Sequence, residues 1–346
     1  MPAALPATPR TRRARRGSGS LTLTDVARLA GVSPITVSRA LNSPDQLNEE
    51  TLARVRDAIE RTGYVPNRIA GGLASSRSRL VAALVPSISS PVFLESVQAM
   101  TEELAASGYQ LMLGESGYGA TREDDLLDAI IGRRPDGIIL TGIMHSPEGR
   151  RRLSAAGIPI VETWDLTPTP IDMLVGFSHE KIGTAVAHYL LDRGSRNPAI
   201  ISADDQRGLL RRAAFQAEAA RRGLRTIPVE LVPAPSSIGA GRRALAALLA
   251  KKPRTDAIFC SSDLLALGAL LEAGSRGVAV PEKLRVFGFG DLNFAADTEP
   301  ALSTVRIDVT RIGRQAARFI IERAAGREIA EPILDLGFTL VERASA

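Results

Sequence analysis

The residues with the clearest chemical use lie between Ser33 and Asn42. Ile35, Thr36 and Arg39 are spaced so that they would point outward from one helix. An arginine can donate two hydrogen bonds to the edge of a guanine, and an apolar side chain can contact the methyl group of a thymine. The pattern therefore predicts recognition of duplex DNA through the major groove, which is wide enough to admit a helix.

A helix-turn-helix over Leu23–Asn42 would hold these side chains in place. Thr24 is expected to cap the first helix, and Gly31 to form the turn, because glycine tolerates a positive φ. Ser33 would cap the second helix, with Pro34 at its first position. The residues expected to pack the two helices together are Val26, Ala27, Ala30 and Val37. An ordinary helical hairpin is the alternative that this pattern alone leaves open.

A third helix from Asn48 to about Thr62 would complete a small core. Its apolar residues form one stripe, and Gly63 would end it. These residues are Leu52, Val55, Ala58 and Ile59. In the following segment, Gly71 and Gly72 disfavour a stable helix. Both a hinge that becomes helical on binding and a plain flexible tether fit that composition.

Positive charge is concentrated at the N-terminal end of the chain. Residues 1–79 hold 13 Lys and Arg against 6 Asp and Glu, whereas the whole chain has a formal net charge of +5. Such an asymmetry is typical of a DNA-binding module attached to a neutral or acidic core. The tail over residues 1–20 carries five arginines among Pro, Ala, Gly and Ser, and is expected to be disordered. It could contact phosphates or be a solvated extension.

From Leu80 onward, apolar runs alternate with predicted helices. Continuous apolar runs that end in small or polar residues are typical of parallel strands buried on both faces. The pattern predicts an α/β core of two lobes, each with a doubly wound parallel sheet. The chain would cross between the lobes near Thr163–Asp172 and again near Leu292–Pro300. A ligand would then bind in a cleft at the carboxyl ends of the strands. The predicted helices include residues 91–107, 180–193, 208–223, 240–250 and 263–276.

Composition excludes several other classes of protein. A single cysteine, Cys260, rules out a disulfide framework, and no apolar run is long enough to cross a bilayer. With no secretory signal either, we expect a cytoplasmic protein without membrane partners. We find no P-loop, dinucleotide fingerprint or metal-ligand spacing, and the three histidines are far apart. We therefore expect neither an enzyme nor a cofactor or metal.

Taken in order, these motifs resemble the lactose/galactose-repressor family of bacterial transcription regulators. The resemblance runs from about Leu21 to Leu340 and includes TLTDVARLAGVSPITVSRALN, YVPNR, GFGD at Gly288–Asp291 and PALSTVR at Pro300–Arg306. It is strongest toward the gluconate-repressor group, through VPSISSPVFLESVQAM, GYQLMLGESGY, GIPIVETWD, DMLVGFS and LDLGFTL. It implies four segments: a disordered tail (1–20), a DNA-binding domain (21–64), a hinge (65–79), and a periplasmic-binding-protein-like domain for effector binding and dimerisation (80–342).

The resemblance also implies how DNA is bound. A homodimer would place one recognition helix, about Pro34 to Leu41, on each half of a near-palindromic operator in double-stranded DNA. Arg39 matches the base-reading arginine, and Leu73 falls at the hinge leucine that enters the minor groove. Pro34 and Ile35 stand where family members differ and choose operators. The remaining residues implied for DNA contact are Thr22, Leu23, Ser33, Thr36, Ser38, Asn42, Asn67 and Arg68.

For the effector site, the resemblance implies carboxylate, amide and arginine groups over an aromatic floor. The implied residues are Phe93, His145, Glu162, Trp164, Arg207, Arg211, Ser262, Asp263 and Asp291. Two arginines four residues apart can clamp an anion, so a sugar acid fits chemically. Some of these residues have plainer alternatives: Asp263 as a helix cap, Phe93 as core and Trp164 as a surface lid. Three positions depart from the family pattern: Ala214 for Gly, Ser262 for Asn and His179 for Asn.

These expectations together describe a repressor whose operator affinity responds to gluconate, a ketogluconate or a phosphorylated sugar acid. A catabolite-type regulator with another sugar or a protein corepressor remains an alternative. A solute-binding protein shares the two-lobe plan but lacks the helix-turn-helix. No heptad segment follows LDLGFTL, so a dimer is expected rather than a tetramer.

Overall fold

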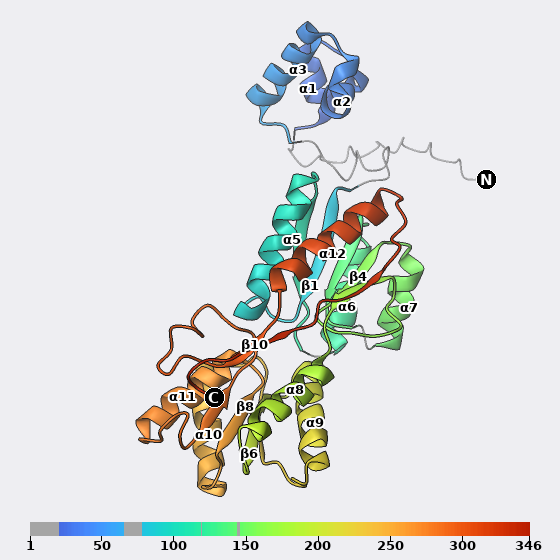
Figure 1. Ribbon diagram of the computed structural model, residues 1–346. Coiled ribbons are helices and arrows are strands. Elements are labelled where there is room, and N and C mark those ends of the chain that lie inside the picture. The colour runs from blue at the N-terminus through green and yellow to red at the C-terminus, as the bar shows by residue number, and fades with distance from the viewer. Residues whose placement is uncertain (1–20, 66–77, 119, 144–145) are drawn as a thin grey trace, which may run out of the picture. The chain divides into compact units, whose positions relative to one another are not determined.

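The computed structural model of the chain describes residues 21–65, 78–118, 120–143 and 146–346 (Figure 1). The chain divides into two compact units, Met1–Ser76 and Arg77–Ala346. We call residues 21–65 the headpiece and residues 78–346 the core unit. The predictions for the tail and for Asn67, Arg68, Leu73 and His145 lie outside the described residues.

The headpiece contains the predicted helix-turn-helix and third helix. Its elements are α1 (Leu23–Ala30), α2 (Pro34–Asn42), the short 3₁₀ helix η1 (Pro44–Gln46) and α3 (Glu49–Thr62). Gly31 has a φ of 65°, as the turn requires. The three helices enclose a small core, as predicted. Its buried residues are Val26, Ala27, Ala30, Val37, Val55, Ala58 and Tyr64.

The cap of the first helix lies two residues earlier than predicted. Thr22, not Thr24, is the N-cap residue of α1. The carboxylate of Asp25 accepts hydrogen bonds from the backbone N–H of Thr22 at 3.0 Å and from its hydroxyl at 2.6 Å. This pair decides where α1 begins, because it satisfies a backbone N–H that the helix itself leaves unpaired. The Ser33 cap is confirmed: its hydroxyl oxygen accepts from the Thr36 N–H at 3.2 Å.

Asn48 caps α3, and its removal should loosen the headpiece. Its side-chain oxygen accepts a hydrogen bond from the backbone N–H of Thr51 at 2.8 Å. We expect Asn48→Ala to destabilise α3 by about 1 kcal/mol, the usual cost of losing such a cap. Amide hydrogen exchange of residues 49–62 in the full chain should then be roughly fivefold faster. Asn48→Asp keeps the acceptor and should exchange as the wild type does; equal exchange in the alanine variant would contradict the role of the cap.

The first lobe of the core unit is built on a six-stranded parallel sheet. The strand order is β11-β5-β4-β3-β1-β2. The strands are β1 (Leu80–Val85), β2 (Gln110–Glu115), β3 (Gly137–Thr141), β4 (Ile160–Thr163), β5 (Met173–Gly176) and β11 (Ile333–Asp335). Helices α5 (Leu94–Ala106) and α12 (Val309–Ala324) cover one face, and α6 (Ala120–Ile131) and α7 (Pro147–Ala156) cover the other (Figure 1).

The second lobe is built on a four-stranded parallel sheet of order β7-β6-β8-β9. Its strands are β6 (Pro198–Ala203), β7 (Val229–Val232), β8 (Ala257–Cys260) and β9 (Arg285–Phe287). Helices α8 (His179–Asp192) and α9 (Gln206–Arg221) pack on one face. Helices α10 (Ile238–Lys251) and α11 (Asp263–Ser275) pack on the other. The predicted fold of two doubly wound parallel sheets is confirmed.

Burial on both faces is visible along single strands. On β1, Val81 and Ala83 belong to the cluster under α5 and α12, while Ala82 and Leu84 belong to the cluster under α6 and α7. Neighbouring residues of a strand point to opposite faces, so both alternating sets must be apolar. This arrangement explains why the sequence shows continuous apolar runs.

No helix within the described residues combines the length and apolar character needed to cross a membrane.

The chain crosses between the lobes at other places than predicted. β5 still belongs to the first sheet, so the first crossing follows it at 177–178 instead of within Thr163–Asp172. Phe294, Ala295 and Leu302 pack in the second lobe, so Leu292–Pro300 is not a crossing either. The return passes from β10 (Thr304–Arg306) to α12, and a third crossing joins β11 to β12 (Thr339–Val341), which pairs antiparallel with β10. The Pro- and Thr-rich segment is a loop within the first lobe.

Candidate functional site

The outer face of α2 carries the side chains predicted to read DNA. Ile35 is 67% exposed, and Arg39 is exposed in the last turn. Thr36 shares a hydrogen bond with Ser33 at 2.9 Å between their hydroxyl oxygens, and Asn42 donates to the backbone oxygen of Ser38. Within residues 21–65, no hydrogen bond or ion pair occupies the guanidinium of Arg39. The headpiece therefore presents a free cation beside an apolar side chain, both accessible to a partner.

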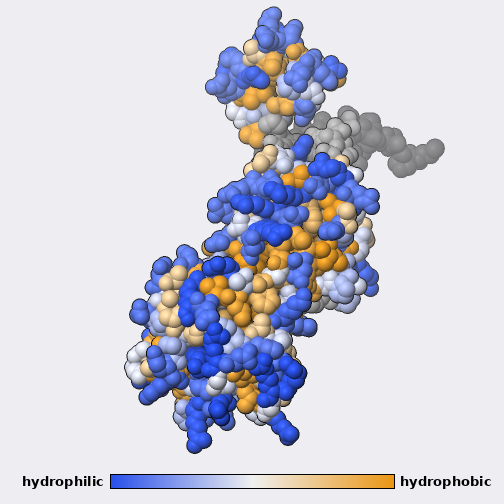
Figure 2. Space-filling model, in the orientation of Figure 1, coloured by the Kyte–Doolittle hydropathy of each residue, from blue (hydrophilic) through white to orange (hydrophobic). Residues whose placement is uncertain are grey.

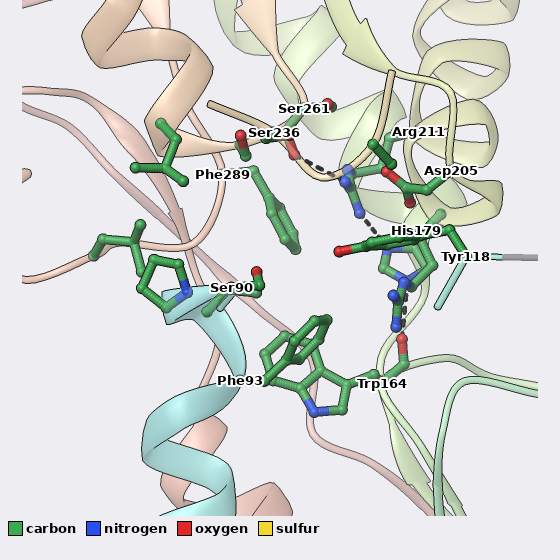
Figure 3. A pocket seen from close by; sticks show the side chains of 17 residues that line it. Ser90, Phe93, Tyr118, Trp164, His179, Asp205, Arg211, Ser236, Ser261 and Phe289 are labelled. Atoms are coloured by element: carbon green, nitrogen blue, oxygen red, sulfur yellow. Dashed lines mark hydrogen bonds between the residues drawn. The ribbon is translucent and has the colours of Figure 1, made fainter. Parts of the chain in front are cut away.

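A second site lies in the core unit, in a cavity at the carboxyl ends of the strands of both lobes. The space between its walls is about 620 Å³ when the open mouth is included. From the first lobe it is lined by Ser90, Phe93, Tyr118 and Trp164. From the second lobe it is lined by His179, Asp205, Arg207, Arg211, Ser236, Ser261, Ser262 and Phe289 (Figure 3).

Arg211 is the most deeply placed cation of this cavity. Only 4% of it is exposed, and its guanidinium carbon lies 3.9 Å from the ring centre of Phe289. Nη1 donates to His179 Nδ1 at 2.8 Å, and Nη2 donates to the carbonyl of Ser261 at 2.9 Å. Burial lowers the pKa of Arg211 to about 10, against the opposing effect of Asp205. The group therefore stays cationic at neutral pH.

His179 lies between Arg211 and the backbone of the first lobe. Its Nε2 is 2.9 Å from the carbonyl oxygen of Trp164. Burial, reinforced by the neighbouring cations Arg211 and Arg207, holds the pKa of His179 well below its usual range. The imidazole is therefore neutral at physiological pH and adds no charge to the site.

The cavity has unused hydrogen-bond donors. Nη1 of Arg207 and Nε of Arg211 are buried without a hydrogen-bond partner among the described residues. Arg207 also lies over the ring of Phe93, with 5.3 Å between its guanidinium carbon and the ring centre. Among the described lining residues, these two cations face one carboxylate, that of Asp205. Buried donors without partners are costly, so the site favours a ligand that brings acceptor oxygens and negative charge.

Aromatic rings line the cavity on opposite sides. Phe93 and Trp164 meet edge to face with 4.9 Å between ring centres, and Trp164 meets Phe177 at 6.0 Å. Phe289 lies across from Phe93 and Trp164 (Figure 3). Trp164 also has a φ of 66°, an unfavourable backbone conformation for a bulky residue. Apolar walls with a few directed polar groups suit a ligand that has C–H faces as well as oxygens.

Five of the nine residues predicted for the effector site line this cavity: Phe93, Trp164, Arg207, Arg211 and Ser262. His145 lies outside the described residues. The remaining three, Glu162, Asp263 and Asp291, do not line it, and each is occupied elsewhere. Their assignment to the effector site stays a prediction.

Glu162 faces away because it alternates with Val161 on β4. Its carboxylate accepts from the backbone N–H of Ile171 at 2.8 Å and lies 3.6 Å from Nη1 of Arg150. Asp291 forms ion pairs with Arg306 and Arg343. Both carboxylates are thus neutralised by arginines of their own surroundings.

Asp263 is not among the residues that line the cavity, and it does not cap α11. Ser262 caps α11, accepting from the N–H of Leu265. Asp263 accepts from the Thr304 hydroxyl at 2.6 Å and from the N–H of Leu292 at 2.8 Å. Burial raises the pKa of Asp263 to about 6, partly offset by these hydrogen bonds. The hydrogen bonds of Asp263 to Thr304 and Leu292 hold the loop that carries Phe289 against β10.

Sequence reasoning missed several lining residues. His179 was noted only as a departure from the family pattern, and Phe289 only as part of GFGD. Other polar lining residues that it missed are Ser90, Tyr118, Asp205, Ser236 and Ser261. Most of them follow the ends of predicted strands, so the rule that ligands bind at those ends could have selected them.

Within the described residues, no group of three or more His, Cys, Asp or Glu side chains could hold a metal ion.

Comparisons with known proteins identify the families that the two units of the chain match. Residues 22–67 match the family described as "Bacterial regulatory proteins, lacI family", and residues 187–346 match the "Periplasmic binding protein-like domain" family. The "HTH-type transcriptional regulator GntR" of Pseudomonas aeruginosa is 42% identical over 95% of this chain and 97% of its own length. The regulator with the same description in Escherichia coli K12 is 32% identical over 92% of this chain and 96% of its own.

Among solved structures, a transcriptional regulator of the LacI family from Silicibacter pomeroyi resembles this chain with a TM-score of 0.89. The two are 32% identical, and the match covers 94% of this chain and 99% of the other. The similarity extends over the headpiece and the core unit together, not over one of them alone.

Proposed function

Because this chain belongs to the lacI family of bacterial regulatory proteins and is a DNA-binding transcriptional regulator, we propose that its effector is a sugar acid. Gluconate, a ketogluconate or a phosphorylated relative binds in the cavity of the core unit. Its binding changes the affinity of the headpiece for the operator. Such a switch is a coupling between two sites through two states of the protein.

The observation that carries this proposal is the pair of unpartnered guanidinium donors on Arg207 and Arg211. A carboxylate supplies the two acceptor oxygens that such donors lack, and guanidinium groups suit it geometrically. The rings of Phe93 and Trp164 offer contact to the carbon chain, while the serine hydroxyls can meet the hydroxyls of a polyol. A neutral sugar would leave the excess positive charge of the described lining uncompensated.

On the DNA side, we assign operator recognition to Arg39, Ile35, Thr36 and Ser38 on α2. Thr22, Leu23, Ser33, Pro34 and Asn42 are assigned to the same interface, with Asn67, Arg68 and Leu73 of the hinge. Two headpieces of a homodimer bind the two halves of a near-palindromic operator. Family membership and the exposed cation of Arg39 support this assignment.

A homodimer is the assembly that the surface supports. The core unit exposes large apolar side chains, among them Leu94 (53%), Leu113 (41%) and Leu271 (49%). Figure 2 shows hydrophobic surface on both lobes of this unit, surrounded by hydrophilic side chains. Exposed apolar surface of this kind is a common feature of protein interfaces. The segments 1–20, 21–64, 65–79 and 80–342 are proposed to act as tail, DNA-binding domain, hinge and effector domain.

Titration calorimetry of the full chain against a panel of ligands tests the effector class. We expect gluconate to bind at least about 30-fold more tightly than glucitol, its neutral analogue, because charged partners add about 2–3 kcal/mol when buried. Gluconate 6-phosphate and 2-ketogluconate distinguish the members of the class. Tighter binding of glucitol than of every acid would reject the proposal in favour of a regulator with a neutral effector. Binding of a protein corepressor alone would favour the catabolite-type alternative.

A further inference from the structure

We propose that His179 is the positioning residue of the effector cavity: its neutral imidazole aims Arg211 into the cavity and holds the backbone of Trp164 in the other lobe. The first half rests on the proposed function, since Arg211 is one of the groups assigned to the carboxylate. The second half concerns the protein alone and can be tested without a ligand.

The partners of His179 dictate which nitrogen carries the proton. A guanidinium can only donate, so Nδ1 must accept from Arg211 Nη1 across 2.8 Å. A carbonyl oxygen can only accept, so Nε2 must carry the hydrogen directed at Trp164 across 2.9 Å. Both bonds exist together only in the neutral ring protonated on Nε2. A proton added to Nδ1 would place two donors against each other.

The surroundings keep the ring in that form and in that place. His179 is 2% exposed and meets the ring of Phe177 edge to face at 4.9 Å between centres. The charged groups around His179 and Arg211 are Arg207 on α9, Asp205 at the N-cap of α9 and Asp165 after β4. The two cations nearest the ring oppose a further positive charge, and Asp205 and Asp165 act instead to stabilise the charge of Arg211.

The same hydrogen bonds run from one lobe to the other. Arg211 donates to the carbonyl of Ser261 in the second lobe and to His179, which donates to the carbonyl of Trp164 after β4 of the first lobe. Trp164 has a positive φ, which an L residue adopts only when its surroundings hold it there. His179 supplies part of that constraint. One side chain therefore fixes both a cation and an aromatic ring of the cavity.

Amide variants separate the two bonds. Asparagine places its amide near the position of Nδ1, so His179→Asn can still accept from Arg211 but cannot reach the carbonyl of Trp164. Glutamine places its amide near the position of Nε2, so His179→Gln can still donate to Trp164 but no longer accepts from Arg211. His179→Phe keeps a ring of similar size and loses both bonds. If His179 served only as packing, phenylalanine would be the mildest change of the three.

The first experiment uses the full chain without ligand. In ¹⁵N-histidine spectra we expect the ring of His179 to be neutral, with its proton on Nε2, across about pH 5 to 8, where free histidine titrates. His179→Asn assigns the signal among the three histidines. Trp164 is the only tryptophan, so fluorescence reports on it directly. Its emission should shift in the Asn and Phe variants and stay unchanged in the Gln variant.

The second experiment measures gluconate binding by calorimetry. We expect the affinity for gluconate to be at least about 10-fold weaker in His179→Gln and His179→Phe, because both variants leave a charged donor of Arg211 unpaired. In His179→Asn the affinity should stay within about 3-fold of the wild type. His188→Asn is the matched control: His188 lies on the same helix with a side chain 39% exposed and should bind as the wild type does. Thermal unfolding of each variant separates loss of binding from loss of fold.

Two results would overturn the positioning role. One is a ring of His179 that titrates between pH 5 and 8 or carries its proton on Nδ1. The other is a His179→Phe protein with unchanged tryptophan emission and unchanged gluconate affinity. Failure of the wild-type chain to bind gluconate, gluconate 6-phosphate or 2-ketogluconate would instead contradict the sugar-acid function, and the spectra and the fluorescence would still decide the role of His179.

Discussion

The Arg211→Met variant should lose its response to gluconate while keeping its fold and its affinity for DNA. Methionine fills much of the same volume but cannot donate a hydrogen bond or carry charge. Its introduction removes the buried cation and leaves the acceptors of His179 and Ser261 without their donor. Removing one partner of a buried charged pair costs about 2–5 kcal/mol, so gluconate affinity should fall by roughly 30-fold or more.

Arg221→Met is the matched control for this loss. Arg221 lies on the same helix, but its side chain is 68% exposed and paired with Glu218. Surface pairs of this kind contribute at most about 1 kcal/mol, and this one is remote from the cavity lining. Calorimetry gives the affinity, and a mobility shift with and without gluconate gives the response. If Arg211→Met bound gluconate as tightly as the wild type, the ligand carboxylate would be held by other residues.

The Arg39→Ala variant should lose operator recognition while binding gluconate normally. A bidentate arginine–guanine contact contributes about 1–3 kcal/mol. In a dimer on a near-palindromic operator the contact occurs twice, so operator affinity should fall by roughly 30-fold or more. The operator is obtained by selection from random duplexes with the wild-type chain, and affinities are compared at one salt concentration, because phosphate contacts are salt-dependent.

Arg61→Ala removes the same charge from α3, where Arg61 pairs with Asp57. It should weaken binding to all duplexes alike and leave the ratio of operator to random DNA unchanged. Arg39→Ala should reduce that ratio. If both variants reduced it equally, or neither did, Arg39 would be a phosphate contact rather than a reader of bases.

The elements of this protein were predictable because their signals are local. Caps, glycine turns and apolar stripes marked the headpiece helices, and continuous apolar runs marked nine of the strands. The cap at Thr22 was not predicted, because it depends on the pairing of Thr22 with Asp25. The positions of the lobe crossings were predicted wrongly for a different reason. A loop rich in proline and threonine has the same composition whether it stays within a lobe or leads to the other lobe.

The site was only partly predictable, because side-chain direction is hidden in a strand buried on both faces. An apolar run gives no alternation from which to tell that Glu162 points away from the cavity. The role of Asp263 depends on Thr304, and that of His179 on Trp164 and Arg211, and all these partners are distant in sequence. Arg207 and Arg211 were found because their spacing on one helix is itself the signal.

The order in which the chain visits its two lobes has a consequence for its synthesis. The second lobe is a nearly continuous stretch from α8 to β10, whereas the first lobe takes α12 and β11 from residues beyond 308. As the chain leaves the ribosome, the second lobe can close while one face of the first sheet still awaits its covering helix. The part of that apolar face that α12 covers stays exposed until residues 309–324 have been synthesised, so the nascent first lobe is open to aggregation for longer than the second lobe.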